Sequence, residues 1–343
     1  MQTASISRRI QQRRRYVLGA LMATLALPAT LWSGMATAQT PPESAPQIRI
    51  GFQKSAVNLV ILKQRGILEQ RFKDSKVSWI EFPAGPQLLE ALAVGSLEIG
   101  LTGDSPPVFA QAAGKDLLYV GVEPPKPESS AVLVPANSAI HTLADLKGKK
   151  IALQKGSSAH YLLVRTVKRA GLQWSDIQPI YLAPADARAA FEKGAVDAWA
   201  IWDPYYGATE LALKPRVLTT GNGLSGNNSF YLASRNFAER YPETVLAILD
   251  ALTAADRYVQ QNRKEVAQLI ADYSGLNLAT VHLFISRRPV PSPTTVLTPA
   301  VTREQQQVAD SFFELGLLPR KVTVADLVWR PAARAGQAPQ ASK

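Results

Sequence analysis

The chain has 343 residues, no cysteine and a formal net charge of +11. This length suffices for one large or two medium domains with well-buried cores. The lack of cysteine excludes disulfides, cysteine-based metal sites and thiol nucleophiles.

The N-terminus has the pattern of a secretory signal peptide. Residues 1–15 carry five arginines and no acid, an apolar run from Tyr16 to Trp32 follows, and Ala36-Thr37-Ala38 forms a small-x-small cleavage site. The run is short for a transmembrane span, so we expect residues 1–38 to be removed on export; an uncleaved signal anchor is the alternative. The pair Arg14-Arg15 resembles a twin-arginine signal, so two export routes stay open.

Removal of this segment would leave 305 residues with a net charge of +6, because 38 residues and five arginines are lost from a chain of 343 and +11. No dense Lys/Arg stripe interleaved with aromatics remains, so nucleic acid is not expected as a partner. A mild positive field suits capture of an anion, or serves only as a solubilising surface.

Apolar strand-like runs alternate with helix-period segments along the rest of the chain, between a disordered leader expected at residues 39–46 and a disordered tail at 331–343. The expected strands are Ile48–Gln53, Val77–Phe82, Leu97–Leu101, Leu118–Val122, Ala131–Pro135, Ile151–Gln154, Ile180–Leu182, Ala198–Trp202, Val217–Thr219 and Phe230–Ser234. Helices are expected between most of them, and a mainly helical segment from Pro242. The alternation predicts an α/β fold with parallel sheets covered on both faces.

One strand–helix–Gly–strand–Asp unit occurs twice. Gly95 precedes Asp104 by nine residues, and Gly194 precedes Asp203 by nine. The repeat predicts two similar α/β lobes around a central cleft, although any two βαβ units look alike. We expect lobe 1 to comprise residues 47–133 and 236–330, and lobe 2 to comprise 134–235.

Ligands bind beyond the carboxyl ends of strands in such sheets. Three segments there suit an oxyanion, because glycine allows close approach and a helix N-terminus offers free N–H groups. They are Thr102-Gly103, Ala84-Gly85-Pro86-Gln87 and Lys155-Gly156-Ser157-Ser158. An ordinary serine N-cap explains the last segment equally well.

Other side chains have competing interpretations. We expect Trp199 to pack in the core and Trp202 to form an aromatic wall of the site. Asp104 and Asp203 are interpreted as helix N-caps beside proline, or as an acid pair across the cleft of the glycosidase type. Asp203 alternatively orients Trp202 or a hinge.

The motifs of several enzyme and cofactor classes are missing from the sequence. The three histidines have no metal-ligand spacing, and no Gly-x-Ser-x-Gly elbow is present. Residues 221–226 match the dinucleotide fingerprint, but an expected strand follows instead of a helix. We therefore expect no catalytic residue, metal or cofactor.

Several longer stretches closely resemble the family of periplasmic aliphatic sulfonate-binding proteins of ABC importers, and the likeness runs from about Ile48 to Trp329. The stretches are residues 80–87, 102–107, 120–127, 154–158, 184–191 and 197–206, among them Thr102-Gly103-Asp104-Ser105-Pro106-Pro107 and Asp197-Ala198-Trp199-Ala200-Ile201-Trp202-Asp203-Pro204-Tyr205-Tyr206.

The resemblance implies a type II periplasmic binding protein fold, an ABC permease as partner, a role in sulfur acquisition and a monomer in the periplasm. It implies a sulfonate ligand; taurine, nitrate and, on the same fold, an enzyme of thiamine-precursor synthesis are the alternatives, and an extracytoplasmic sensor stays open. The expected ligand-binding residues are Gln53, Gln87, Thr102, Gly103, Asp104, Ser157, Ser158, Trp202, Asp203, Asn228 and Ser229.

A sulfonate is a permanent monoanion with three acceptor oxygens. We expect helix-end N–H groups and hydroxyls to hold it without a buried arginine, whose desolvation is costly. Thr102, Gly103, Ser157 and Ser158 are the expected head-group contacts, and Trp202 is expected to pack on the tail.

Overall fold

The structure is a computed structural model that describes residues 45–331. The expected signal peptide and most of the expected leader and tail lie outside the described residues. At the described end of the leader, Ala45 is buried and its N–H donates to the Thr244 hydroxyl at 3.3 Å. No helix among residues 45–331 combines the length and apolarity needed to span a bilayer.

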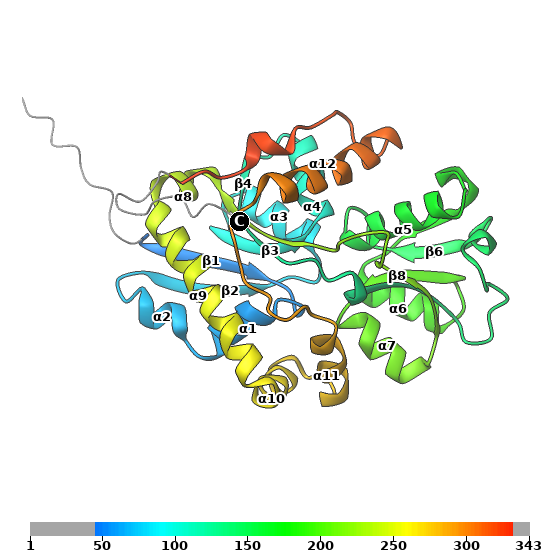
Figure 1. The fold of residues 1–343 in the computed structure, drawn as a ribbon, viewed down its shortest axis with the longest axis horizontal. Helices are drawn as coiled ribbons and strands as arrows, with labels where there is room; N and C mark the ends of the chain where they lie inside the picture. Colours follow the sequence, from blue (N-terminus) through cyan, green and yellow to red (C-terminus); the bar gives the residue numbers. More distant parts are fainter. Residues whose placement is uncertain (1–44, 332–343) are drawn as a thin grey trace, which may run out of the picture. The chain divides into compact units, whose positions relative to one another are not determined.

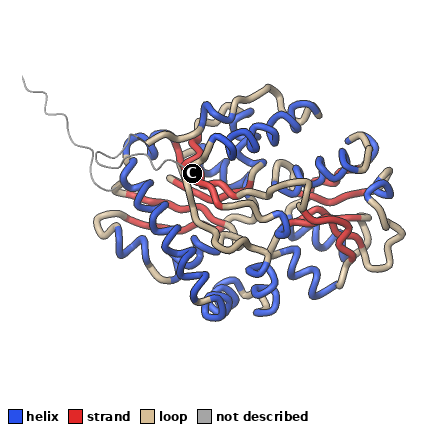
Figure 2. Tube along the Cα trace, in the orientation of Figure 1, coloured by secondary structure: helices blue, strands red, loops and turns tan. Residues whose placement is uncertain are grey.

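Two five-stranded sheets form the framework (Figures 1 and 2). The first has the order β2-β1-β3-β10-β4 and the second the order β7-β6-β8-β5-β9. The first contains β1 (Gln47–Phe52), β2 (Lys76–Glu81), β3 (Ile99–Gly103), β4 (Leu117–Glu123) and β10 (Ser229–Ser234). The second contains β5 (Ser130–Val134), β6 (Lys150–Leu153), β7 (Gln178–Tyr181), β8 (Ala198–Trp202) and β9 (Arg216–Thr220).

The two sheets have equivalent topology, strand for strand. Three neighbouring strands of each are parallel, and the fourth in spatial order, β10 or β5, runs antiparallel. The repeated unit seen in the sequence falls at the same place in both: Gly95 leads into β3 and Gly194 into β8, each the central strand. The prediction of an α/β fold with two similar halves is confirmed.

Helices cover both faces of each sheet. They are α1 (Val57–Gln64), α2 (Ile67–Arg71), α3 (Gly85–Ala93), α4 (Ser105–Ala112), α5 (Ser158–Arg169), α6 (Pro184–Glu192), α7 (Tyr205–Leu213), α8 (Arg235–Arg240), α9 (Pro242–Gln261), α10 (Arg263–Ser274), α11 (Leu278–Ser286) and α12 (Pro299–Glu314). Short 3-10 turns span Pro127–Ser129, Leu143–Leu146, Trp174–Asp176 and Val324–Leu327. The mainly helical reading from Pro242 onward is confirmed.

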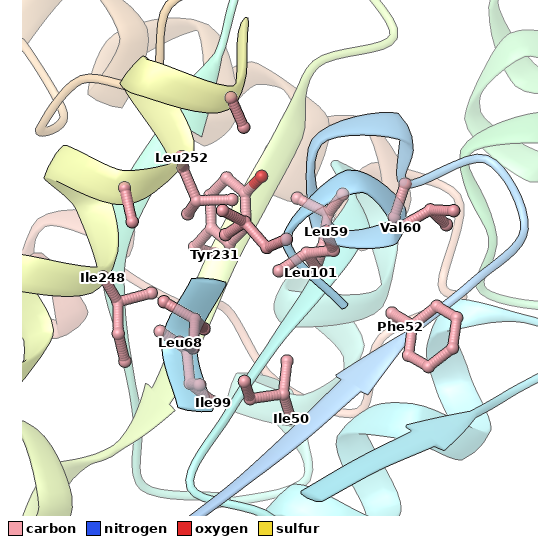
Figure 3. Packing of buried hydrophobic residues seen from close by; sticks show 14 of the residues in the cluster. Ile50, Phe52, Leu59, Val60, Leu68, Ile99, Leu101, Tyr231, Ile248 and Leu252 are labelled. Atoms are coloured by element: carbon pink, nitrogen blue, oxygen red, sulfur yellow. The ribbon is translucent and has the colours of Figure 1, made fainter. Parts of the chain in front are cut away.

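Each sheet has a hydrophobic core on each of its two faces, and successive residues of a strand pack into one core and then the other. On β10, Tyr231 packs with α1 and α9 on one face (Figure 3), whereas Phe230 packs with α3, α4 and α12 on the other. On β8, Ala200 faces α5 while Trp199 faces α6. Trp199 is 0% exposed, which confirms its predicted core role. Such strands read as continuous apolar runs because both faces are buried.

The sheet membership of two strands differs from the expected lobe boundaries. Residues 130–133 were expected in lobe 1, but they belong to β5, which pairs with β8 and β9 of the second sheet. Ser229–Ser234 was expected in lobe 2, but it pairs with β3 and β4 of the first. The chain therefore crosses between the sheets at 124–129 and 221–228. A short apolar run contains no local information about which sheet it joins. The boundaries expected from the sequence, at 133/134 and 235/236, therefore fall beyond the actual crossings.

Candidate functional site

A cavity of about 50 Å³ lies where the carboxyl ends of strands from both sheets meet. It has room for a few water molecules or one small head group, since a water needs about 10–15 Å³ by the same measure. The first sheet and its connections contribute Gln53, Ser55, Gly85, Leu101, Thr102, Gly103, Pro106 and Ser229. The second contributes Ser157, Ser158, Trp202 and Asp203, and Lys126, Ser129, Asn227, Phe284 and Arg288 complete the wall.

Eight of the eleven expected ligand-binding residues line this cavity: Gln53, Thr102, Gly103, Ser157, Ser158, Trp202, Asp203 and Ser229. The other three do not. Gln87 lines a neighbouring groove, and Asp104 and Asn228 line a separate hollow. Asp104 is buried and accepts a hydrogen bond from Ser105 Oγ at 2.8 Å. Burial raises the pKa of this carboxyl.

Hydroxyl groups and helix N-termini surround the cavity. Thr102 Oγ1 is buried without a hydrogen-bond partner, whereas Ser157 Oγ donates to the Gln154 carbonyl at 2.7 Å. Ser157 is the N-cap of α5, and its side chain makes no capping bond. The first-turn amides of a helix have no partner within the helix and favour an anion. This wall therefore offers neutral donors.

Gly103 permits a very close approach between β3 and the start of α5. A Cβ at this position would lie 1.8 Å from Ser158 Oγ. We predict that Gly103→Ala weakens ligand binding about ten-fold or more, because overpacking costs about 1–3 kcal/mol. Calorimetric titration checks this. Unchanged affinity in Gly103→Ala would contradict the prediction.

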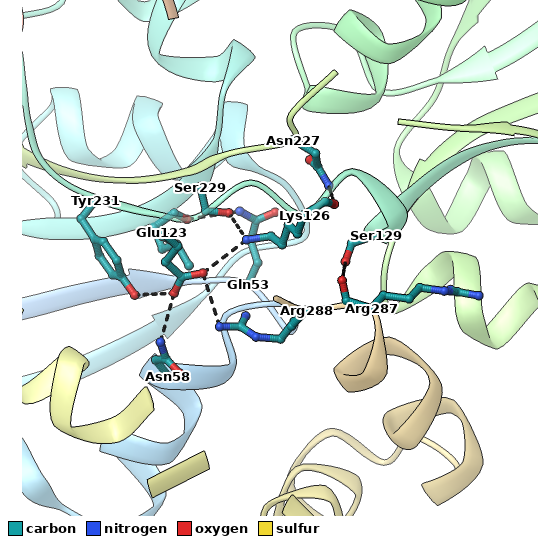
Figure 4. Close-up of polar contacts among 11 residues, drawn as sticks. Gln53, Asn58, Glu123, Lys126, Ser129, Asn227, Ser229, Tyr231, Arg287 and Arg288 are labelled. Carbon is teal, nitrogen blue, oxygen red and sulfur yellow. Dashed lines mark hydrogen bonds and ion pairs between the residues drawn. The ribbon is translucent and has the colours of Figure 1, made fainter. Parts of the chain in front are cut away.

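A buried cluster of charges forms the opposite wall (Figure 4). Glu123, at the end of β4, is 1% exposed and faces two cations. Lys126 Nζ lies 3.3 Å and Arg288 Nη2 3.5 Å from its Oε2, and Lys126 also donates to Ser229 Oγ at 2.6 Å. Tyr231 Oη donates to Glu123 Oε1 at 2.9 Å.

The cluster has one positive charge in excess. Burial alone would raise the pKa of Glu123, but Arg288 and Lys126 outweigh burial and lower it. Burial lowers the pKa of Lys126, and Glu123 opposes that shift. Arg288 is 7% exposed, and its Nη2 has no hydrogen-bond partner. A buried cation with an unused donor at a cavity wall is suited to an anion.

This arginine corrects the expectation of a site without one. Arg288 lies 165 residues from Glu123 in the sequence, just after α11, and Lys126 lies in the proline-rich crossing segment. Neither occupies a strand end or a helix N-terminus, the places where site residues were sought. The pattern of charges alone gave no signal that they meet.

A second arginine, Arg287, joins α11 to the second sheet. Its Nη1 contacts the Asp203 carboxylate at 3.0 and 3.2 Å, its Nη2 binds Glu210, and its guanidinium lies over the Tyr206 ring at 3.8 Å. Burial raises the pKa of Asp203 to about 6, although Arg287 opposes this. Asp203 thus pairs with a cation and Asp104 with a serine hydroxyl, which does not support an acid pair.

His160 fixes the loop that carries Ser157. It is 0% exposed, and its Nδ1 accepts the Gly156 N–H at 3.2 Å. Its ring packs against Phe109 and Phe312, with centroids 6.1 and 5.0 Å away. Burial, with a smaller effect of Lys155, lowers the pKa of His160 to about 3.

Because His160 is buried in its neutral form, we predict that the free energy of unfolding decreases in acid. The unfolded chain takes up its proton near pH 6.5, whereas the native state does so only near pH 3. The contribution is therefore complete above about pH 6.5 and falls as the pH drops, by about 3 kcal/mol at pH 4. His160→Asn, which keeps an acceptor for Gly156, should lose this part of the pH dependence. Urea unfolding at pH 7 and pH 4 measures it; equal pH dependence in both proteins would contradict the prediction.

Two topologically equivalent α/β sheets that place their strand ends around a small polar cavity define the class of periplasmic-type solute-binding proteins. The chain belongs to the NMT1-like family, whose model matches residues 41–271.

Among similar proteins, one from Escherichia coli K12 named as a candidate aliphatic sulfonates-binding protein is 50% identical over 298 residues, covering 86% of this chain and 92% of that protein. The alkanesulfonate-binding protein SsuA from Xanthomonas axonopodis pv. citri, solved with MOPS bound, is 50% identical with a TM-score of 0.81, covering 84% of this chain and 99% of that one. The periplasmic aliphatic sulphonate-binding protein SsuA from Escherichia coli is 48% identical with a TM-score of 0.79, covering 88% and 97%. All three are named for binding, as expected, rather than for catalysis.

Proposed function

We propose that this protein is a non-catalytic, exported solute-binding protein that captures aliphatic sulfonates in the periplasm and delivers them to the permease of an ABC importer for sulfur acquisition. The SsuA relatives of similar sequence and fold support the ligand class. The signal-peptide pattern of residues 1–38 supports export. We further propose that the protein acts as a monomer.

The observation that carries the proposal is the excess positive charge at the cavity. Glu123 offsets one of the two cations, Lys126 and Arg288, so a single negative charge on the ligand would leave the buried site neutral. A sulfonate supplies that one charge at all accessible pH values. Buried charges are stable when paired and hydrogen-bonded, which matches a monoanion better than sulfate, a dianion.

The three sulfonate oxygens would share donors from both walls. We assign Arg288 Nη2, Thr102 Oγ1 and the Ser158 hydroxyl to them, with amides of Gly103 and the α5 N-terminus beside them. Gln53 Nε2 donates to the Leu101 carbonyl at 3.2 Å, so its second N–H is proposed as a further donor to the anion. Trp202, which lines the cavity, is proposed as a contact for the carbon attached to the sulfur.

Delivery requires that the permease distinguish the loaded form. Ligand contacts on both sheets, together with the Arg287–Asp203 contact, would favour a closed arrangement of the two halves. The importer would then read this form by its differential affinity for it.

A thermal-shift screen of the mature protein tests the proposal. A ligand at one hundred times its Kd stabilises the native state by about 2.7 kcal/mol. Alkanesulfonates should raise the melting temperature by several degrees, and taurine, nitrate and sulfate serve as competing candidates. A response to nitrate or sulfate alone would overturn the sulfonate assignment.

A further inference from the structure

The cavity is too small to hold a whole organic sulfonate. Sites for organic ligands have volumes of about 300–1,000 Å³, whereas this cavity measures about 50 Å³. A groove of about 460 Å³ lies beside it. One wall is formed by α3 and α4 of the first half, and the other by residues 154–156, which follow β6 of the second half.

The groove and the cavity adjoin each other. Pro106 lines both of them. On α3, Gly85 lines the cavity and the next residue, Pro86, lines the groove; before α5, Ser157 lines the cavity and the preceding residue, Gly156, lines the groove. A molecule anchored among the hydroxyls would pass Pro106 to reach the groove.

The groove has the chemistry for a carbon chain. Leu89, Phe109 and Ala110 give it an apolar wall. The amide oxygens of Gln87 and Gln154 are buried there without a hydrogen-bond partner, so it also offers acceptors for a hydroxyl or N–H group. The charged residues that also line it, Glu90, Lys115 and Lys155, are exposed to solvent.

A different hollow beside the cavity fits less well. It is lined by Asn228 together with Asp104, Arg165 and Glu304, which bring charges of both signs. It shares no lining residue with the cavity. An alkyl substituent would desolvate these charges without compensation.

We infer that the groove between α3, α4 and residues 154–156 is the subsite for the organic substituent of the sulfonate, and that it selects ligands by chain length. This inference rests on the proposed function. It assigns Gln87, which does not reach the head-group cavity, to the substituent instead.

Calorimetric titration with methanesulfonate and hexanesulfonate tests the subsite. One buried methylene is worth about four-fold in affinity, so the wild type should bind hexanesulfonate at least about ten-fold more tightly. Ala110→Phe fills the groove at a residue that does not line the cavity, so it should reduce this ratio to about three-fold or less. Its affinity for methanesulfonate should stay unchanged.

Ala110→Ser is the matched control at the same position and should retain the wild-type ratio. A wild-type ratio near one, or a ratio that Ala110→Phe leaves intact, would overturn the inference while methanesulfonate binding upholds the proposed function. A ratio lost in Trp202→Ala but kept in Ala110→Phe would place the substituent against Trp202 and also overturn it. If neither sulfonate binds the wild type, the proposed function fails, and the inference fails with it.

Discussion

Replacing Arg288 by glutamine should lower sulfonate affinity by at least about thirty-fold. The change removes a 93%-buried cation whose Nη2 has no protein hydrogen bond, and leaves Glu123 with Lys126 alone. The excess positive charge of the site then disappears. Truncating one partner of a buried, hydrogen-bonded charge pair costs about 2–5 kcal/mol in binding. Isothermal titration calorimetry of the purified variant measures the loss.

Arg303→Gln is the matched control, because Arg303 is exposed on α12 and lines neither the cavity nor the groove. It makes the same change in net charge and should bind like the wild type. Equal losses in both variants would mean that long-range charge, not the Arg288 contact, attracts the ligand. Full affinity in Arg288→Gln would exclude this residue from the site.

The double substitution Thr102→Val/Ser158→Ala should lower affinity by about one hundred-fold or more. A hydrogen bond to a charged group contributes about 1.5–3 kcal/mol, so two lost bonds amount to about 3–6 kcal/mol. Thr102 Oγ1 has no partner in the protein, so its removal breaks no internal bond. Calorimetry again gives the affinity.

Thr302→Val/Ser311→Ala controls for the loss of two hydroxyls at a distance. Both hydroxyls donate to backbone carbonyls one turn earlier, Thr302 to Thr298 and Ser311 to Gln307, in exposed hydrogen bonds. This variant should keep wild-type affinity and melt within a few degrees of the wild type. Sulfonate affinity that survives the Thr102/Ser158 change would show that the neutral donors are not part of the site.

The sequence predicted the fold where local pattern determines structure. The nine-residue spacing from Gly95 to Asp104 and from Gly194 to Asp203 identified the central strand of each sheet. These strands are buried on both faces, so their apolar runs are unambiguous. The strand ends then located Thr102 and Trp202 at the cavity, because the carboxyl ends of parallel strands meet there.

Contacts that form only because the chain crosses from one sheet to the other could not be predicted. β5 and β10 each pair with strands far away in sequence, and nothing in a five- or six-residue apolar run specifies the partner. The Glu123–Arg288 pair was missed for a similar reason. A buried ion pair between distant residues has no periodic signature, so an argument from desolvation favoured a site without arginine, and that argument was wrong about Arg288.

Direct titration of the mature protein with ethanesulfonate and with sulfate, at equal ionic strength, tests the central claim most directly. Calorimetry should show one ethanesulfonate bound per chain, and much weaker binding of sulfate, because a second negative charge finds no partner beside Glu123. Sulfate binding as tight as sulfonate binding, or no heat with any alkanesulfonate, would contradict the assignment of a monoanionic sulfonate to this cavity.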